Sequence, residues 1–176
     1  MKNAGMVHYY YGDGKGKTTS AFGLCLRAAG HNFKVLILQL LKSKETGERN
    51  ALKNFNNITL IPCPEKVKFA FKMNSNEISQ LKKEYLEIIN QVFEKCEKEK
   101  YDMLFIDEIG SCIDLKIVDK GMLIDLIKKR PKNLEIIMTG HKENKDIFNI
   151  CDYVSYIKKI KHPFDSGISA RTGIEK

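Results

Sequence analysis

A glycine-rich stretch near the start of the chain carries the residues best suited to binding phosphate. Backbone N–H groups in such a loop turn toward an anion, a lysine reaches phosphate oxygens, and a threonine hydroxyl helps to hold Mg²⁺. The usual G-x-x-x-x-G-K-[ST] spacing asks for glycine at position 11, where this chain has Tyr11. Counted from Gly12, the loop is one residue shorter than the usual form. The candidate phosphate-binding residues are Gly12, Asp13, Gly14, Lys15, Gly16, Lys17, Thr18 and Thr19.

Two acidic residues, Asp107 and Glu108, end the apolar stretch LFIDE. In proteins with a phosphate loop, a carboxylate at the tip of a buried strand reaches the metal directly or through water. We therefore expect Thr18, Asp107 and Glu108 to form a Mg²⁺ site. The loop and the acidic pair together indicate a protein that binds a magnesium nucleotide, but they do not name a reaction.

The pattern of apolar residues predicts strands that alternate with helices. Strands are expected at 6–11, 34–41, 58–63, 102–108, 134–140 and 153–160, and helices at 18–30, from Asn74 to about Cys96, around 119–130 and near 146–150. This alternation predicts a mainly parallel sheet with helices on both faces. The expected fold class is one α/β domain over 1–176, of the phosphate-loop NTPase (RecA-like) type. The irregular segments 42–57, 62–75 and 161–176 are expected to supply ligand-contacting loops.

The bulk composition is that of an ordinary globular protein. The chain has 176 residues, of which 43% are hydrophobic and 30% charged, and no apolar run is long enough to span a membrane. The beginning, MKNAGMVHYYYG, has no signal-peptide pattern, so we expect a cytoplasmic protein without a membrane partner. The five cysteines are widely spaced and lack a C-x-x-C pair, which favours buried thiols over disulfides or a zinc site.

The net charge of +8 favours anionic partners. A triphosphate and a substrate with a phosphate tail satisfy this as well as a nucleic acid does. Acidic residues are mixed into several of the lysine-rich stretches, which indicates a solvated surface and no nucleic-acid partner.

Several stretches, taken together and in order, are similar to one known family. The loop and the helix that follows it, then GERN, FIDEI, RPKNLEIIMTG and the closing KHPFDSGISARTGIE, resemble the ATP:corrinoid adenosyltransferases. The resemblance runs from Tyr11 to Glu175. It implies that ATP is the co-substrate with Mg²⁺, and that a reduced Co(I) corrinoid attacks the C5′ carbon of the ATP ribose and expels triphosphate. It also implies a homodimer and an electron-donating reductase or flavodoxin-like protein.

The resemblance also implies roles for individual residues. Lys17 would stabilise charge on the departing triphosphate, and the aromatic pair Phe69 and Phe71 would exclude an axial ligand from cobalt. The family form has tryptophan at the second of these positions, and this chain has no tryptophan. Segment 161–176 would close over the site. Further residues expected to contact nucleotide or corrinoid are Arg27, Glu48, Arg49, Asn50, His162 and Arg171.

The chain departs from the family pattern at a few positions. His141 follows IIMTG where arginine is common, Tyr156 stands where an acidic residue is usual, and Ser43 replaces a frequent glycine. Two other functions remain open at this point: a small phosphate-loop ATPase or kinase, and a basic nucleic-acid-binding protein with a regulatory ATP site.

Overall fold

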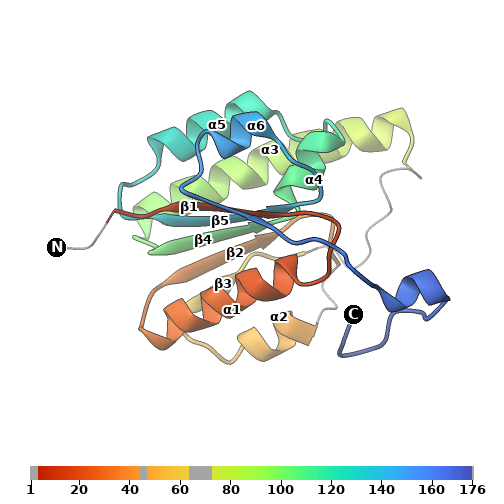
Figure 1. The fold of residues 1–176 in the computed structure, drawn as a ribbon. Coiled ribbons are helices and arrows are strands. Elements are labelled where there is room, and N and C mark those ends of the chain that lie inside the picture. Colours follow the sequence, from red (N-terminus) through yellow and green to blue (C-terminus); the bar gives the residue numbers. More distant parts are fainter. Residues whose placement is uncertain (1–3, 44–46, 64–72, 176) are drawn as a thin grey trace.

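Six parallel strands form one sheet at the centre of the molecule (Figure 1). The computed structural model describes residues 4–43, 47–63 and 73–175. Every strand pairing in this part of the chain is parallel, in the order β3-β2-β4-β5-β1-β6. The strands are β1 (Val7–Tyr11), β2 (Val35–Gln39), β3 (Ile58–Leu60), β4 (Met103–Asp107), β5 (Glu135–Gly140) and β6 (Tyr153–Tyr156).

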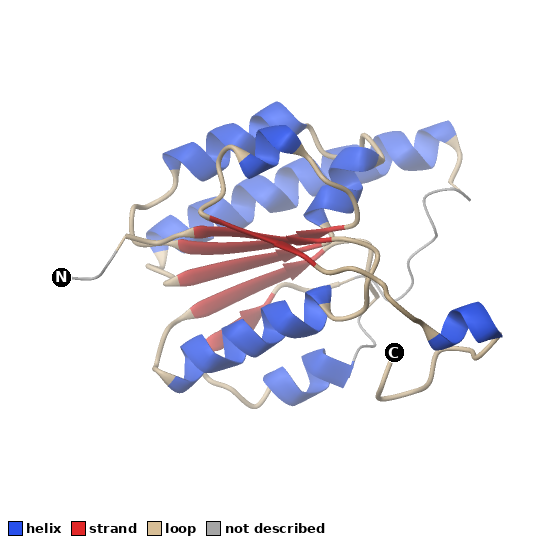
Figure 2. Cartoon of the chain, viewed as in Figure 1, coloured by secondary structure: helices blue, strands red, loops and turns tan. Residues whose placement is uncertain are grey.

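Helices cover both faces of this sheet, as the alternating pattern predicts (Figure 2). Helices α1 and α2 lie on one face, and the remaining α-helices lie on the other. A short 3₁₀ turn, η2 (Pro163–Ser166), belongs to the C-terminal segment, which extends away from the sheet. The helices are α1 (Lys17–Gly30), α2 (Gly47–Leu52), α3 (Ser75–Lys98), α4 (Ile109–Asp114), α5 (Lys120–Lys129) and α6 (Lys145–Phe148).

The central strands are apolar along their whole length because both of their faces are buried. In β4, Leu104 and Ile106 pack into the core beneath α3, α4 and α5, whereas Met103 and Phe105 pack into the core beneath α1. Side chains alternate between the faces of a strand, so each strand contributes to both cores. The expected α/β fold with a parallel sheet is confirmed.

Helix α3 begins where its sequence predicts. The Asn74 side chain accepts a hydrogen bond from the Glu77 N–H (2.9 Å), and the Glu77 carboxylate accepts one from the Asn74 N–H (2.8 Å). This reciprocal capping box satisfies backbone donors that the first turn leaves free.

Several element predictions are wrong in detail; among them, the strand expected over 58–63 ends at Leu60. Between the strand expected at 102–108 and the helix expected around 119–130 we expected only a loop, but this part of the chain contains α4. The segment 42–57, expected to be irregular, contains α2. Both helices have only six residues. The formation of such short helices depends on tertiary contacts more than on local helix propensity. The strand expected over 153–160 ends at Tyr156, because its neighbour β1 ends at the paired residue Tyr11.

The cysteines are free thiols: Cys25, Cys96 and Cys112 are buried, and Cys63 and Cys151 are half-buried. Within the described residues, no three His, Cys, Asp or Glu side chains gather into a metal-binding cluster. The helices in this part of the chain include none with the length and apolar character needed to cross a membrane.

Candidate active site

The phosphate loop connects the carboxyl end of β1 to the first turn of α1. Gly12 (φ 124°) and Gly16 (φ 117°) take backbone conformations that favour glycine. The loop also lies against the chain that follows β6: the Gly14 N–H donates to the Ile157 carbonyl oxygen (2.8 Å). A Cβ atom on Gly12 would lie 2.3 Å from that same oxygen. The glycines therefore allow both the turn and the close approach of the two segments.

Tyr11 belongs to the strand and not to the loop. Its ring stacks on Tyr156 of β6, with centroids 5.1 Å apart, and contacts Phe148 of α6 at 5.0 Å. Position 11 is thus a packing position, and Gly12 is the first residue of the loop. The tyrosine at position 156 is explained by the same contact, since it provides the partner ring.

Lys17 lies inside the curve of the loop. Its side chain is buried, and its ammonium donates to the Gly14 carbonyl oxygen (2.9 Å). Burial lowers the pKa of this ammonium, while the nearby carboxylates of Glu108 and Asp13 oppose the change. The Lys17 ammonium therefore places a positive charge next to any anion that the loop binds.

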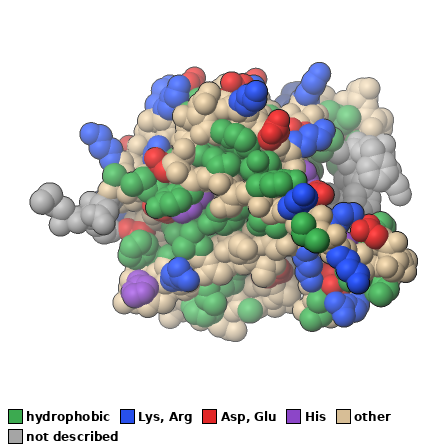
Figure 3. All heavy atoms as spheres, in the orientation of Figure 1, with side chains coloured by type: hydrophobic (Ala, Val, Ile, Leu, Met, Phe, Trp, Pro, Cys, Tyr) green, Lys and Arg blue, Asp and Glu red, His purple; other side chains and the backbone are tan. Residues whose placement is uncertain are grey.

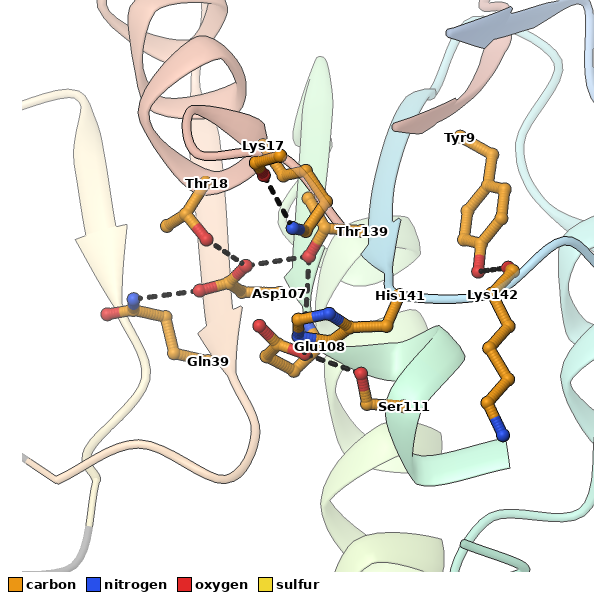
Figure 4. A network of polar contacts seen from close by, with 11 residues as sticks. Tyr9, Lys17, Thr18, Gln39, Asp107, Glu108, Ser111, Thr139, His141 and Lys142 are labelled. Atoms are coloured by element: carbon orange, nitrogen blue, oxygen red, sulfur yellow. Dashed lines mark hydrogen bonds and ion pairs between the residues drawn. The ribbon is translucent and has the colours of Figure 1, made fainter. Parts of the chain in front are cut away.

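The Thr18 hydroxyl points at the end of β4 and donates to the Asp107 carboxylate (3.0 Å; Figure 4). Asp107 is completely buried and also accepts hydrogen bonds from Thr139 (2.7 Å) and the Gln39 amide (3.2 Å). Burial raises the pKa of this carboxyl, and the Lys42 charge and the Thr139 hydrogen bond oppose that effect. The carboxyl ends of β2, β4 and β5 therefore converge on one carboxylate. The residue types alone did not point to Gln39 or Thr139, although each is a lone polar residue near the end of an apolar strand.

Glu108 lies beside Asp107 in a left-handed conformation (φ 60°). Its N–H donates to the Thr139 hydroxyl (2.8 Å), and its carboxylate accepts a hydrogen bond from Ser111 (2.6 Å). The His141 ring nitrogen Nε2 lies 3.7 Å from the same carboxylate (Figure 4). Hydroxyl and carboxylate oxygens are the ligands that Mg²⁺ prefers, so Thr18, Asp107 and Glu108 form a donor set that fits this ion.

Arg49 is buried, and its contacts lie within the fold. Its guanidinium donates to the Gln39 side-chain oxygen (3.2 Å) and to the Ile61 carbonyl oxygen (2.8 Å). Through Gln39 it is linked to Asp107. Of its neighbours, Glu48 is half-buried, and Asn50 is exposed and accepts a hydrogen bond from Lys53. Arg49 therefore positions the end of β2.

One further predicted residue, Arg27, stands apart from the loop. Arg27 is exposed in the last turn of α1, about 15 Å along the helix axis from Lys17. The structure does not bring it to the site. Phe69 and Phe71 lie outside the described residues.

The C-terminal segment, by contrast, returns to the phosphate loop. The Lys159 N–H donates to the Asp13 carboxylate (3.0 Å), and the Lys15 ammonium donates to the Glu175 carboxylate (3.1 Å). Loop and segment line a cavity of about 290 Å³ that is open to solvent. His162 lines this cavity, and its Nδ1 accepts a hydrogen bond from the Phe164 N–H (3.1 Å). The lining residues include Asp13, Gly14, Lys17, His162 and Arg171.

One family model matches nearly the whole chain. The family model described as ATP:corrinoid adenosyltransferase BtuR/CobO/CobP matches residues 3–175, which include both the loop and the C-terminal segment. The chain belongs to this family. The resemblance seen in the separate motifs is therefore confirmed over nearly the whole chain.

Curated relatives in the family are similar along most of their length. A corrinoid adenosyltransferase of Escherichia coli (strain K12) is 29% identical over 177 residues, covering 97% of this chain and 85% of the relative. The corrinoid adenosyltransferase CobA of Salmonella typhimurium (strain LT2) is 28% identical over 181 residues, with 99% and 87% covered. One from Sinorhizobium sp is 26% identical over 175 residues, with 97% and 80% covered.

Proposed function

We propose that this member of the ATP:corrinoid adenosyltransferase family transfers the 5′-deoxyadenosyl group of ATP to the cobalt of a reduced corrinoid. Co(I) supplies an electron pair and forms a bond to the C5′ carbon of the ribose. The C5′–O bond breaks, and its electron pair leaves with triphosphate. The products are an adenosylated Co(III) corrinoid, such as adenosylcobalamin or an adenosylated precursor, and intact triphosphate.

One observation carries the proposal: the phosphate loop and the C-terminal segment share a cavity. A small phosphate-loop ATPase or kinase needs the loop and the acidic strand end, but it does not need the segment KHPFDSGISARTGIE. In this chain the segment contacts the loop through Asp13 and Lys15. The two motifs that make the resemblance specific therefore meet in space.

In this proposal the loop holds the leaving group. Backbone N–H groups of the loop and the Lys17 ammonium stabilise the negative charge that builds on triphosphate as the C5′–O bond breaks. Bound Mg²⁺, held by Thr18, Glu108 and Asp107, would supply further positive charge to the phosphate oxygens. The family resemblance also implies that the loop grips ATP in a reversed sense, with the far phosphate where other enzymes hold a nearer one. This grip would direct the ribose carbon toward the corrinoid.

No general base is required, because the cobalt nucleophile already carries its electron pair. Glu108 is accordingly assigned to the metal and not to water activation. Its hydrogen bond from Ser111 holds its carboxylate in place.

Other features of the proposal come from the resemblance. Phe69 and Phe71 keep an axial ligand away from cobalt, residues 161–176 act as a closing segment of a single adenosyltransferase domain, and the protein works as a homodimer. We propose separately that it is cytoplasmic. An electron-donating reductase or flavodoxin-like protein supplies Co(I).

The proposal is tested with purified protein, MgATP and chemically reduced cobalamin under anaerobic conditions. We expect light-sensitive adenosylcobalamin and one triphosphate for each cobalt alkylated. Release of orthophosphate or a phosphorylated acceptor, without a cobalt–carbon bond, would instead identify the ATPase or kinase alternative. Lys17→Gln serves as a matched loss-of-function variant.

A further inference from the structure

The Glu175 carboxylate forms hydrogen bonds with two cationic side chains, Lys15 and Arg171, that line the cavity beside the phosphate loop. Glu175 accepts hydrogen bonds from Lys15 Nζ (3.1 Å) and from Arg171 Nη2 (2.8 Å) through one oxygen. Its other oxygen accepts from the Arg171 backbone N–H (2.9 Å) and from Nε (3.0 Å). A two-pronged guanidinium contact with a lysine beside it is also how proteins bind phosphate oxygens.

Of the three side chains, that of Glu175 is the least exposed to solvent. The Glu175 side chain is 16% exposed, whereas those of Lys15 and Arg171 are 46% and 59% exposed. The Arg171 hydrogen bonds hold the pKa of the Glu175 carboxyl far below its usual range, so this side chain stays negatively charged at neutral pH. The three residues, with Lys17, line the same cavity.

The part of the chain that carries Glu175 is attached to the rest at two separate points. Lys159 anchors the beginning of the segment to the loop through its N–H to Asp13 (3.0 Å), and its ammonium contacts Asp165 of η2 within the segment (3.0 Å). Beyond η2 the chain passes through Gly167 (φ 78°) and Gly173 (φ 79°) and turns back toward the loop (Figure 1). The surface here carries basic and acidic side chains close together (Figure 3). Loss of the contact between Lys15 and Glu175 would release residues 169–175 from the loop, while Lys159 stays bonded to Asp13 and the N–H groups of residues 167–168 stay bonded to η2.

We propose that Lys15, Arg171 and Glu175 form a carboxylate latch, in which Glu175 competes with the phosphates of ATP and of the triphosphate product. A phosphate chain that binds Lys15 and Arg171 displaces Glu175, since two anions cannot share these cations without repulsion. When the adenosyl group has left, Glu175 returns and promotes release of triphosphate. The latch rests on the proposed function only in naming triphosphate as the product.

The direct test is binding of inorganic tripolyphosphate with Mg²⁺, measured by titration calorimetry. Glu175→Gln removes the negative charge and keeps the shape, so we expect this variant to bind tripolyphosphate on the order of tenfold more tightly than the unaltered protein. Equal or weaker binding would overturn the latch. Glu175→Asp keeps the charge and should bind no more tightly than the unaltered protein; a gain as large as that of Glu175→Gln would show that charge competition is wrong.

Two controls separate the latch from simpler effects. Glu97→Gln makes the same change in net charge at an exposed position of α3, and we expect unchanged affinity. If Glu97→Gln bound tripolyphosphate as much more tightly as Glu175→Gln does, the gain would come from the change in net charge alone, and the latch would be rejected. In a Lys15→Gln background, the gain from Glu175→Gln should shrink below about threefold, because interacting residues are not additive. A gain that stays tenfold would exclude competition for Lys15.

The binding result and the adenosylation result are independent. Suppose that the variants bind tripolyphosphate in the expected order of affinity, but the protein forms no adenosylated corrinoid. This result would refute the proposed function and would still support the latch. Adenosylation with unchanged affinity in Glu175→Gln would refute the latch alone.

Discussion

The Thr18 hydroxyl of the phosphate loop donates a hydrogen bond to the Asp107 carboxylate at the end of β4, with 3.0 Å between the oxygens. This contact joins the two motifs that we propose to bind phosphate and metal. It also sets the distance between the first turn of α1 and the carboxyl end of the sheet.

Thr18→Val keeps the shape of the side chain and removes the hydroxyl. We expect the affinity for Mg²⁺ in the presence of ATP to fall on the order of 10- to 100-fold, because the proposed metal ligand is lost and Asp107 loses a hydrogen-bond donor. Thr18→Ser retains the hydroxyl and should retain most of the affinity. Calorimetry with MgATP checks both variants, and an equal loss in the two would contradict a role for the hydroxyl.

Gly12→Ala and Gly16→Ala separate steric overlap from backbone strain. Both glycines have positive φ, so each substitution carries strain of about 1–3 kcal/mol. Only at Gly12 would the new Cβ meet a backbone atom, the Ile157 oxygen at 2.3 Å. Urea unfolding should therefore show a larger loss of stability for Gly12→Ala. The reverse order would mean that the loop does not pack against Ile157.

Arg49→Ala removes the donors that bind Gln39 and Ile61. We expect the free energy of unfolding to fall by about 2 kcal/mol, since buried acceptors lose a charged partner. Asn50→Ala, at the next and exposed position, should change it by less than about 0.5 kcal/mol. If Arg49→Ala is as stable as Asn50→Ala but binds ATP poorly, Arg49 contacts the ligand and the structural assignment is wrong.

Glu135 begins β5, at the end of the sheet opposite to the phosphate loop, and it makes the stability of the protein depend on pH. Burial by itself raises the pKa of its carboxyl, but hydrogen bonds from His8 (2.5 Å) and from the Met6 N–H (2.7 Å) outweigh this and leave the pKa below its usual value of 4.5. A lowered folded-state pKa gives stability that is present above the unfolded value and is lost as the pH falls through the folded value. We therefore expect the unaltered protein to have a higher Tm than Glu135→Gln at pH 7, and the difference to vanish in acid. A constant difference between pH 7 and pH 3 would contradict this.

Replacement of Phe69 and Phe71 by alanine tests the prediction that rests on residues outside the described part of the chain. We expect adenosylation to fall more when the reaction starts from Co(II) with a reductant than when it starts from Co(I) reduced beforehand. The reason is that an axial ligand opposes reduction and not alkylation. Equal losses in the two assays would reject the ligand-excluding role.

The order of elements was predictable because apolar periodicity is a local property. The buried run around β2 and the helical spacing in α3 both follow from which faces must leave water. The short helices α2 and α4 were not predictable in this way. Arg49 of α2 is held by contacts with Gln39 and Ile61, which are separated from it along the chain.

The sequence by itself determined the phosphate loop, the acidic pair at the end of β4 and the family, because these depend on residue types at fixed spacing. Only the tertiary structure decided which residues surround Asp107. Gln39, Thr18 and Thr139 meet there because parallel strands β2, β4 and β5 end at the same edge of the sheet, beside the start of α1. The tertiary structure also explained Tyr11 as a packing residue and brought Glu175 to Lys15, since contacts between distant segments leave no periodic signal in a sequence.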